Sequence, residues 1–175
     1  PIREKRSKKV NHQLTTPPKA GDETINLGVI GAGNYAMTSL LPAFQKANGQ
    51  FESITSERNL SAHEAKKRFK IKKILSGSQD VFDSHCNSVI IATRHDTHAN
   101  LVCDALLAGK NVFVEKPICL TSKELEKIEK IYYGLQTPLK LMVGFNRRFS
   151  PLIKEAKELL ASLSGPKSFA MTINA

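Results

Sequence analysis

Tryptophan is absent from this sequence of 175 residues, and aromatic residues make up only 6% of it. Domains that bind single-stranded nucleic acid stack bases on aromatic side chains, so this scarcity argues against such a function. The formal net charge is +10, but a charge run such as residues 66–73 usually forms a solvated face. We therefore expect no nucleic-acid partner, and a salt-dependent interaction with DNA is the result that would favour one.

Cysteine is also scarce, since the chain has only Cys86, Cys103 and Cys119, an odd number without paired spacing. This pattern argues against a disulfide framework and predicts free thiols in a reducing compartment. No apolar run is long enough to span a bilayer, and the chain does not open with a signal-peptide pattern. We expect a cytoplasmic protein with no membrane partner. His95, His98 and Cys103 match no zinc-binding spacing, so we expect no metal site.

Positive charge is concentrated at the start of the chain. Residues 1–20 hold six Lys or Arg against one Glu, and Pro17, Pro18 and Gly21 lie at the end of this region. Proline, glycine and like charges favour an extended, unpacked chain. We predict that residues 1–24 form a basic flexible arm or linker.

A short apolar strand leads directly into a glycine turn in the segment NLGVIGAGNYA, residues 26–36. Gly31 can make the tight turn, Gly33 lets a pyrophosphate approach the backbone, and Ala36 lets the next helix pack closely on the strand. Asn34, Tyr35 and Ala36 begin that helix, whose free N–H groups and positive dipole end favour phosphate. The turn predicts a dinucleotide site formed by these residues, although similar patterns also close ordinary turns.

Strands and helices alternate through the rest of the chain. Further strands are expected at residues 51–55, near residues 71–74, and at residues 88–93, 111–114 and 139–144. Pro42 should kink the first helix or delay its regular start. Asp96 is the expected N-cap of a helix over residues 97–107, and Thr121 and Glu124 form a capping box for a helix that ends near Tyr133. This alternation predicts an α/β fold with a doubly wound, mostly parallel Rossmann sheet over residues 25–148.

The end of the second strand decides which dinucleotide is favoured. Ser56 occupies the place of the acidic residue that accepts hydrogen bonds from the adenosine ribose, and Arg58 follows shortly after. A small hydroxyl and a guanidinium can accommodate a 2′-phosphate. We therefore expect NAD or NADP as the cofactor, with a preference for NADP. Arg58 could equally be a solvated loop charge.

Three further segments carry a resemblance to a known family: ATRHDTH at residues 92–98, AGKNVFVEKP at residues 108–117 and GFNRRF at residues 144–149. With the glycine turn, they resemble in order and spacing the Gfo/Idh/MocA oxidoreductases over about residues 25–175. The resemblance implies a nicotinamide-dependent enzyme that transfers hydride to or from a hydroxyl carbon of a sugar, sugar nucleotide or cyclitol. Residues 93–98 are most similar to a bi-domain branch, in which a zinc alcohol-dehydrogenase-like half precedes this one in bacterial polysaccharide biosynthesis.

The resemblance also implies roles for individual residues. Lys116 would be the catalytic residue, lying beside the nicotinamide and contacting the substrate hydroxyl that loses its proton. Glu115 would approach the nicotinamide, and Thr93, Arg94 and His98 would line the cofactor between the pyrophosphate and the nicotinamide ribose. An exposed charge at a strand end is the simpler interpretation of Lys116, but the carboxyl end of a parallel strand is where open α/β sheets bind ligands.

The family usually has Pro-Asn where this chain has Arg94-His95. Arg147 and Arg148 follow the sixth strand, where the resemblance implies substrate contacts, and a guanidinium suits polyhydroxylated or carboxylated sugars. We predict that Arg147 and Lys116 bind substrate, and a plain surface charge is the alternative for Arg147.

The last part of the chain predicts the start of a second domain. Ser150-Pro151 begins an amphipathic helix, Gly165-Pro166 turns it, and residues 168–174 begin a strand. The resemblance implies that a substrate-binding α+β domain starts within residues 149–175 and is truncated here. We expect this chain to bind the cofactor without turning over substrate, and the full-length protein to be a homo-oligomer. A non-catalytic dinucleotide-sensing module is the alternative function.

Overall fold

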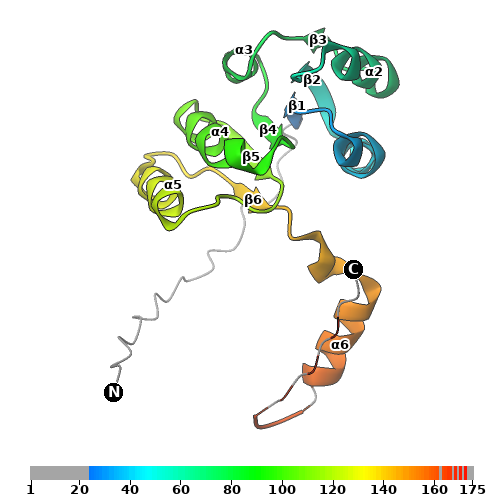
Figure 1. Cartoon of the computed structure of the whole chain (residues 1–175), viewed down its shortest axis with the longest axis vertical. Helices are drawn as coiled ribbons and strands as arrows, with labels where there is room; N and C mark the ends of the chain where they lie inside the picture. Colours follow the sequence, from blue (N-terminus) through cyan, green and yellow to red (C-terminus); the bar gives the residue numbers. More distant parts are fainter. Residues whose placement is uncertain (1–23, 162, 167, 169, 171, 173–175) are drawn as a thin grey trace.

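The computed structural model describes residues 24–161, 163–166, 168, 170 and 172. Six strands form one parallel sheet in the order β3-β2-β1-β4-β5-β6 (Figure 1). The strands are β1 (Asn26–Ile30), β2 (Gln50–Thr55), β3 (Lys73–Ile74), β4 (Ser88–Ile91), β5 (Asn111–Val114) and β6 (Leu141–Val143). The chain winds outward from β1 in one direction and from β4 in the other. The predicted doubly wound Rossmann fold is therefore confirmed.

The helices alternate with the strands. They are α1 (Leu41–Lys46), α2 (Asn59–Phe69), α3 (Ser78–Phe82), α4 (His95–Leu107), α5 (Ser122–Gly134) and α6 (Pro151–Ala161), with a π-helical turn η1 (Ala36–Leu40) and a 3₁₀ turn η2 (Asn146–Phe149). In Figure 1, α2 lies at the β3 end of the sheet, whereas α4 and α5 lie side by side near β5 and β6.

Both faces of the sheet are covered, because alternate residues of the central strands pack into two separate hydrophobic clusters. Val29 of β1 and Ile90 of β4 pack with residues of η1, α1 and α2. Ile30 and Ile91, the next residues along the same strands, pack with residues of α3, α4 and α5. A continuous apolar sequence suits such strands, since a parallel sheet covered by helices has no solvated face.

The helix after the glycine turn starts irregularly. The turn η1 is π-helical, and regular α-helix begins only at Leu41, with Pro42 in its first turn. Because α1 continues directly from η1, Pro42 lacks a backbone N–H that a continuous α-helix would bond to the preceding turn, and that turn is π-helical here. The predicted delay of the regular helix is confirmed. Met37, Leu40 and Leu41 are buried against the sheet.

The two predicted helix starts have different outcomes. Helix α4 begins at His95 with Arg94 as its N-cap, so the prediction that Asp96 caps it is wrong. Arg94 has extended backbone angles and Asp96 lies in the first turn, where a carboxylate favours the helix dipole. The capping box of α5 is confirmed by reciprocal hydrogen bonds between Thr121 and Glu124. Hydrogen bonds from the N–H groups of Leu120 and Thr121 lower the pKa of the Glu124 carboxyl.

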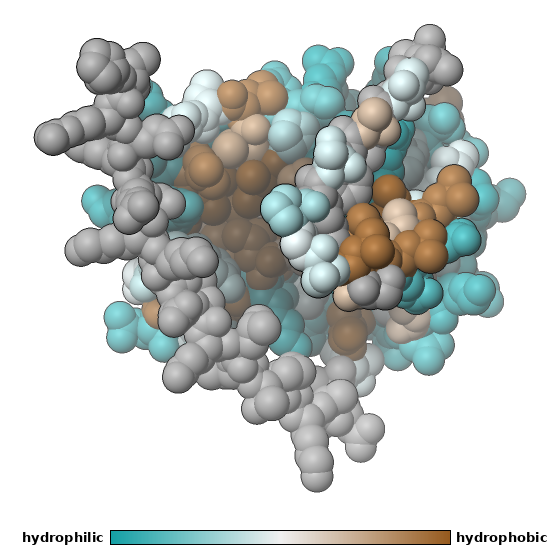
Figure 2. Space-filling view, turned by 90° about the horizontal axis from the view of Figure 1, so that it is seen from below, coloured by the Kyte–Doolittle hydropathy of each residue, from teal (hydrophilic) through white to brown (hydrophobic). Residues whose placement is uncertain are grey.

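The end of the described chain exposes apolar side chains. Helix α6 starts at Pro151 as expected, and Leu152, Ile153 and Leu159 are exposed on it. Figure 2, which views the molecule from the side on which α6 lies, shows hydrophobic residues on this surface. Most of the strand expected over residues 168–174, and all but one residue of the arm expected over residues 1–24, lie outside the described residues. None of the described helices combines the length and apolar character needed to cross a bilayer.

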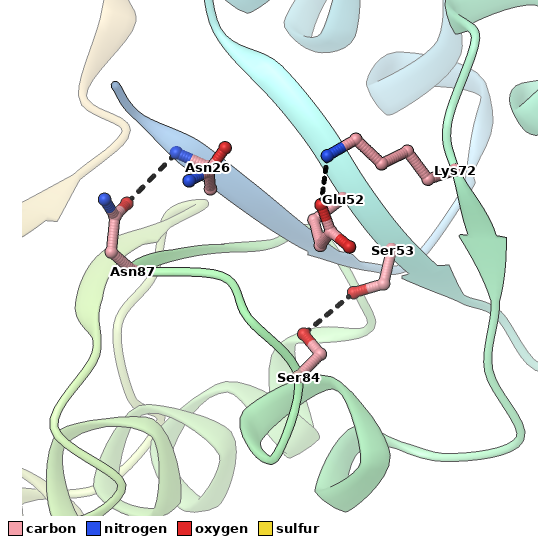
Figure 3. A network of polar contacts seen from close by, with 6 residues as sticks. All are labelled: Asn26, Glu52, Ser53, Lys72, Ser84 and Asn87. Carbon is pink, nitrogen blue, oxygen red and sulfur yellow. Dashed lines mark hydrogen bonds and ion pairs between the residues drawn. The ribbon is translucent and has the colours of Figure 1, made fainter. Parts of the chain in front are cut away.

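At the amino ends of the strands, polar groups bind one another (Figure 3). The backbone N–H of Asn26 donates to Oδ1 of Asn87 at 3.2 Å, and Nδ2 of Asn111 donates to the carbonyl of Asn87 at 3.2 Å. Nζ of Lys110 donates to the carbonyls of Ser84 and Cys86 at 3.1 and 2.7 Å. These bonds hold the starts of β1, β4 and β5 together.

Candidate dinucleotide-binding site

The candidate site lies at the carboxyl ends of β1 and β4. These neighbouring strands are where the winding of the sheet reverses, and open α/β sheets bind ligands in the crevice at such a point. Gly31 follows β1 directly, and Ala92 and Thr93 follow β4. The predicted glycine turn and the Thr93 segment therefore lie next to each other.

Gly31 is required by the protein itself. Its φ is +100°, and a Cβ built on it would lie 2.4 Å from the carbonyl oxygen of Ala92 and 3.1 Å from the backbone nitrogen of Thr93. The first of these distances is far shorter than a van der Waals contact, and L side chains rarely adopt this backbone conformation. The glycine thus lets the turn pack against the end of β4.

Gly33 differs from Gly31 because no contact within the described part of the chain requires a glycine there. A Cβ built on Gly33 would have no atom of the described residues within 4 Å. Gly33 instead borders two cavities, and a glycine there keeps the backbone accessible to a bound group. The N–H groups of Asn34, Tyr35 and Ala36 lie in the first helical turn, where a helix has no internal acceptor for them. A pyrophosphate fits this combination.

Two cavities meet over the glycine turn. The first, here called the β2-side cavity, has a volume of about 750 Å³, and the second, the β5-side cavity, has a volume of about 720 Å³. Gly33, Asn34, Ala92 and Thr93 line both of them, so they adjoin along the edge of the sheet. Two adjoining cavities joined by a glycine turn suit an elongated ligand with two ends.

The β2-side cavity contains the residues predicted to select the cofactor. Ser56 and Arg58 follow β2 and line it, as does Arg94. The guanidinium of Arg94 lies 3.7 Å from the carboxylate of Glu57, and both side chains are about three-quarters exposed, at 77% and 76%. Arg94 thus places a positive charge beside the one carboxylate in the Ser56 to Arg58 segment.

The β5-side cavity contains the predicted reactive groups. Glu115 and Lys116 follow β5 and line it together with Tyr35 and Arg147. Lys116 is exposed, whereas Glu115 is partly buried against Gly144, on which a Cβ would lie 2.7 Å from the Glu115 carboxylate. A glycine at position 144 therefore lets this carboxylate occupy its place beside the end of β6.

A hydrogen bond that the sequence did not predict closes one wall of the β5-side cavity. Nδ2 of Asn146 donates to the hydroxyl of Tyr35 at 2.6 Å and lies 3.4 Å from Oε1 of Glu115. Tyr35 and Asn146 are 111 residues apart, so no local pattern could reveal the contact. The sequence offered one signal for Asn146 at the site: this residue follows the sixth strand, whose carboxyl end lies at the same edge of the sheet as the glycine turn.

His98 borders the β5-side cavity, but its ring nitrogens face the protein. The residue is fully buried, with Nδ1 2.7 Å from the carbonyl oxygen of Pro117 and Nε2 3.2 Å from that of Thr93. His98 lines the β5-side cavity, while both of its ring nitrogens lie within hydrogen-bond distance of backbone carbonyl oxygens. Its contact with a cofactor stays a prediction.

All the predicted site residues reach this edge of the sheet. Those that line the β2-side cavity are Gly31, Gly33, Asn34, Ser56, Arg58, Thr93 and Arg94. Those that line the β5-side cavity are Gly33, Asn34, Tyr35, Ala36, Thr93, His98, Glu115, Lys116 and Arg147. The prediction missed Asn146 and the serines Ser61, Ser76 and Ser78, which lie in or just before helices α2 and α3. No cluster of His, Cys, Asp or Glu suited to a metal ion is found among the described residues.

Comparison with known proteins agrees with this geometry. An inositol 2-dehydrogenase of Rhizobium meliloti (strain 1021) is 46% identical over 65 residues, which cover 37% of this chain and 19% of the relative. Scyllo-inositol dehydrogenase from Lactobacillus casei, solved with NAD(H) and scyllo-inositol, is 26% identical with a TM-score of 0.71 over 79% of this chain and 41% of that one. KijD10, a 3-ketoreductase from Actinomadura kijaniata solved with NADP and TDP-benzene, is 25% identical with a TM-score of 0.72 over 79% and 42%.

The chain spans less than half the length of the curated relatives that it matches across most of its own length. The part that matches the family model below forms the sheet, the β2-side cavity and most of the lining of the β5-side cavity. Residues 25–145 match the model of the Gfo/Idh/MocA proteins, described as an oxidoreductase family with an NAD-binding Rossmann fold. The chain belongs to the Gfo/Idh/MocA oxidoreductase family.

Proposed function

We propose that this chain is the cofactor-binding part of a nicotinamide-dependent dehydrogenase acting on a CH–OH group. The observation that carries the proposal is the pair of cavities that adjoin over Gly33, a glycine on which a Cβ would meet no atom of the described residues within 4 Å. The pyrophosphate would lie on the glycine turn, the adenosine in the β2-side cavity and the nicotinamide in the β5-side cavity. A nicotinamide bound there supplies hydride transfer.

Lys116 is the group that we propose to move the proton. Removing hydride from an alcohol carbon requires the hydroxyl proton to leave, and an amine beside that hydroxyl can accept it. Lys116 lies at the carboxyl end of β5 and lines the same cavity as Glu115. Arg147, on η2, lines the same cavity and would orient substrate oxygens with its guanidinium.

We propose a cyclitol, sugar or sugar nucleotide as the substrate. The names of the relatives, which include inositol dehydrogenases and a 3-ketoreductase solved with TDP-benzene, support this class. The exposed cations Lys116 and Arg147 suit a ligand rich in hydroxyl or carboxylate groups. The three cysteines are free thiols, which supports a reducing compartment such as the cytoplasm.

Binding by the glycine turn is tested by calorimetric titration of the Gly33→Val variant with NADP⁺ and NAD⁺. A branched side chain at Gly33 would occupy the place proposed for the pyrophosphate, so we expect binding to be lost while stability is retained. Gly134→Val is the matched control, because a Cβ there also has no described atom within 4 Å and the residue lies in α5, away from both cavities. Equal affinities for the parent and the Gly33→Val variant would contradict the proposal.

We further propose that NADP⁺ is bound at least as well as NAD⁺. Ser56 brings no charge to the adenosine ribose, Arg58 can pair with a 2′-phosphate, and Arg94 offsets the charge of Glu57. The Ser56→Asp variant should then shift the preference toward NAD⁺, because its carboxylate repels the 2′-phosphate. The Ser56→Asn variant carries a side chain of the same shape as Asp but without the charge, so it should not shift the preference. A wild-type preference for NAD⁺ of about tenfold, equivalent to about 1.4 kcal/mol, would rule this out.

A further inference from the structure

His98 connects the two loops that carry the proposed reactive groups. It lies in the first turns of α4, is fully buried, and borders the β5-side cavity. Its Nδ1 lies 2.7 Å from the carbonyl oxygen of Pro117, the residue after Lys116, and its Nε2 lies 3.2 Å from the carbonyl oxygen of Thr93, which follows β4. One imidazole thus contacts the two segments that follow the neighbouring parallel strands β4 and β5.

The chemistry of these contacts fixes the direction of the hydrogen bonds. A carbonyl oxygen can only accept, so the imidazole must donate to it. Nδ1 makes the shorter contact, at 2.7 Å, so we assign the hydrogen bond to Nδ1, which donates to the carbonyl of Pro117, whereas Nε2 lies 3.2 Å from the carbonyl oxygen of Thr93. The backbone immediately after Lys116 is therefore held by a side chain from a different element.

We propose that His98 is a positioning residue for Lys116. By donating to the carbonyl of Pro117 it holds the loop after β5 against the end of β4, so that Lys116 stays at the wall of the β5-side cavity. The inference rests on the proposed function for the role of Lys116, but the tether itself is a property of the chain without a ligand. His98 acts through the loop, and its own ring nitrogens need no contact with cofactor or substrate.

Packing alone is the competing explanation for a buried histidine. An apolar residue of similar size would fill the same space but would donate no hydrogen bond to Pro117. The two explanations therefore differ in what His98→Leu should do. His98→Asn separates them further, because its amide nitrogen lies near the position of Nδ1 and can restore the donor. Val102→Ala is a matched control, since Val102 is a fully buried residue of the same helix within the hydrophobic cluster.

The first measurement is the NMR order parameter of the backbone amides of Lys116 and Ile118 in the chain without ligand. We expect values near 0.85 in the parent and in Val102→Ala, and values below about 0.6 in His98→Leu, as for a flexible loop. His98→Asn should restore the higher values. Unchanged order parameters in a folded His98→Leu variant would overturn the proposal.

The second measurement compares the affinities for NADP⁺ and for adenosine 2′,5′-diphosphate, which lacks the nicotinamide half. Loss of one positioning hydrogen bond should weaken NADP⁺ binding to His98→Leu by about 3- to 10-fold and leave the adenosine fragment unaffected. A general loss of structure would weaken both ligands, and equal changes would overturn the proposal. If the parent binds neither nucleotide, the proposed function fails, while the order parameters still decide whether His98 holds the loop.

Discussion

The two edges of the sheet use their polar side chains differently. At the amino ends of β1, β4 and β5, Asn87, Asn111 and Lys110 donate to or accept from neighbouring backbone groups. At the carboxyl ends, the cationic side chains of Arg58 and Lys116 are exposed and border the two cavities. One edge thus holds the strands together, and the other exposes cationic side chains beside the two cavities.

This difference explains why the fold can be stable and still expose cationic side chains at the carboxyl edge of the sheet. A hydrogen bond between two protein groups contributes to stability only if the two groups are paired in the folded state. The polar groups of the amino edge meet that condition, whereas exposed cations at the carboxyl edge contribute little to stability. Substitutions at the two edges should therefore change different properties.

Lysines at the two ends of β5 give the sharpest test of this comparison. Lys116→Ala in the full-length enzyme should lower kcat about 10²–10⁴-fold, the usual contribution of a positioned acid or base. The affinity for NADP⁺ and the free energy of unfolding should change little, because Lys116 is exposed. Steady-state kinetics and calorimetry measure both effects. A Lys116→Ala enzyme with an undiminished rate would remove the proposed role of this residue.

Lys110→Ala should show the opposite behaviour. Lys110 precedes β5, and its Nζ donates to the carbonyls of Ser84 and Cys86 at 3.1 and 2.7 Å. Losing these bonds should destabilise the fold by about 1–3 kcal/mol without changing the affinity for NADP⁺. Urea unfolding measures the first effect. If Lys110→Ala weakened cofactor binding while leaving stability intact, the division between the two edges would be wrong.

Gly31 is an exception to this comparison. It lies at the carboxyl edge, but close packing within the protein requires a glycine there. Gly31→Ala adds a Cβ 2.4 Å from the carbonyl oxygen of Ala92 at a φ of +100°. Strain and overpacking together should cost about 2–4 kcal/mol of stability, measured by thermal unfolding. Gly33→Ala, which meets no described atom within 4 Å, should stay within about 0.5 kcal/mol. Equal losses for the two variants would contradict the contacts described for Gly31.

Glu52 predicts the smallest effect and one that depends on pH. The hydrogen bond from Nζ of Lys72, at 2.6 Å, lowers the pKa of the largely buried Glu52 carboxyl against the opposing effect of burial, and the charges of Lys72, Lys73 and His85 lower it further (Figure 3). A lowered folded-state pKa stabilises the fold above the unfolded value, near 4.3, and this stabilisation is lost as the pH falls through the folded value.

The Glu52→Gln variant should therefore lose about 1 kcal/mol at neutral pH and approach the parent in acid. Urea unfolding of both proteins from neutral pH to about pH 3 measures the difference. A gap between the two proteins that widens as the pH falls would contradict the assignment. Affinity for NADP⁺ at neutral pH should be unaffected, since neither cavity includes Glu52.

The sequence predicted those features that local patterns determine. The glycine turn, the capping box of α5 and the delay caused by Pro42 depend on residues close together in the chain, and all three are present. Periodicity also predicted the alternating elements, and the carboxyl-edge rule brought the motifs after β1, β2, β4, β5 and β6 to one edge. Asp96 was misplaced because the helix begins at His95, two residues before the expected start, and helix boundaries are weakly determined by sequence.

Contacts between distant residues were beyond the reach of those patterns. The bond between Tyr35 and Asn146 joins residues 111 positions apart, and that between His98 and Pro117 joins residues 19 positions apart. The resemblance named His98 as a residue near the cofactor, but only the side-chain geometry shows that its ring nitrogens face carbonyls. Likewise, the ion pair between Glu57 and Arg94 connects the loops after β2 and β4. Such contacts depend on the packed fold, and no residue spacing encodes them.

Mapping NADP⁺ binding on the ¹⁵N-labelled chain by NMR tests the central claim most directly. We predict shifts in the amides of residues 31–36, 56–58, 93–98 and 115–116, all at the carboxyl edge. The amides of Asn26, Glu52, Asn87 and Asn111 should not respond, because they lie toward the amino edge. A chain whose carboxyl-edge amides show no response to the dinucleotide, or one whose largest shifts lie at the amino edge, would contradict the account.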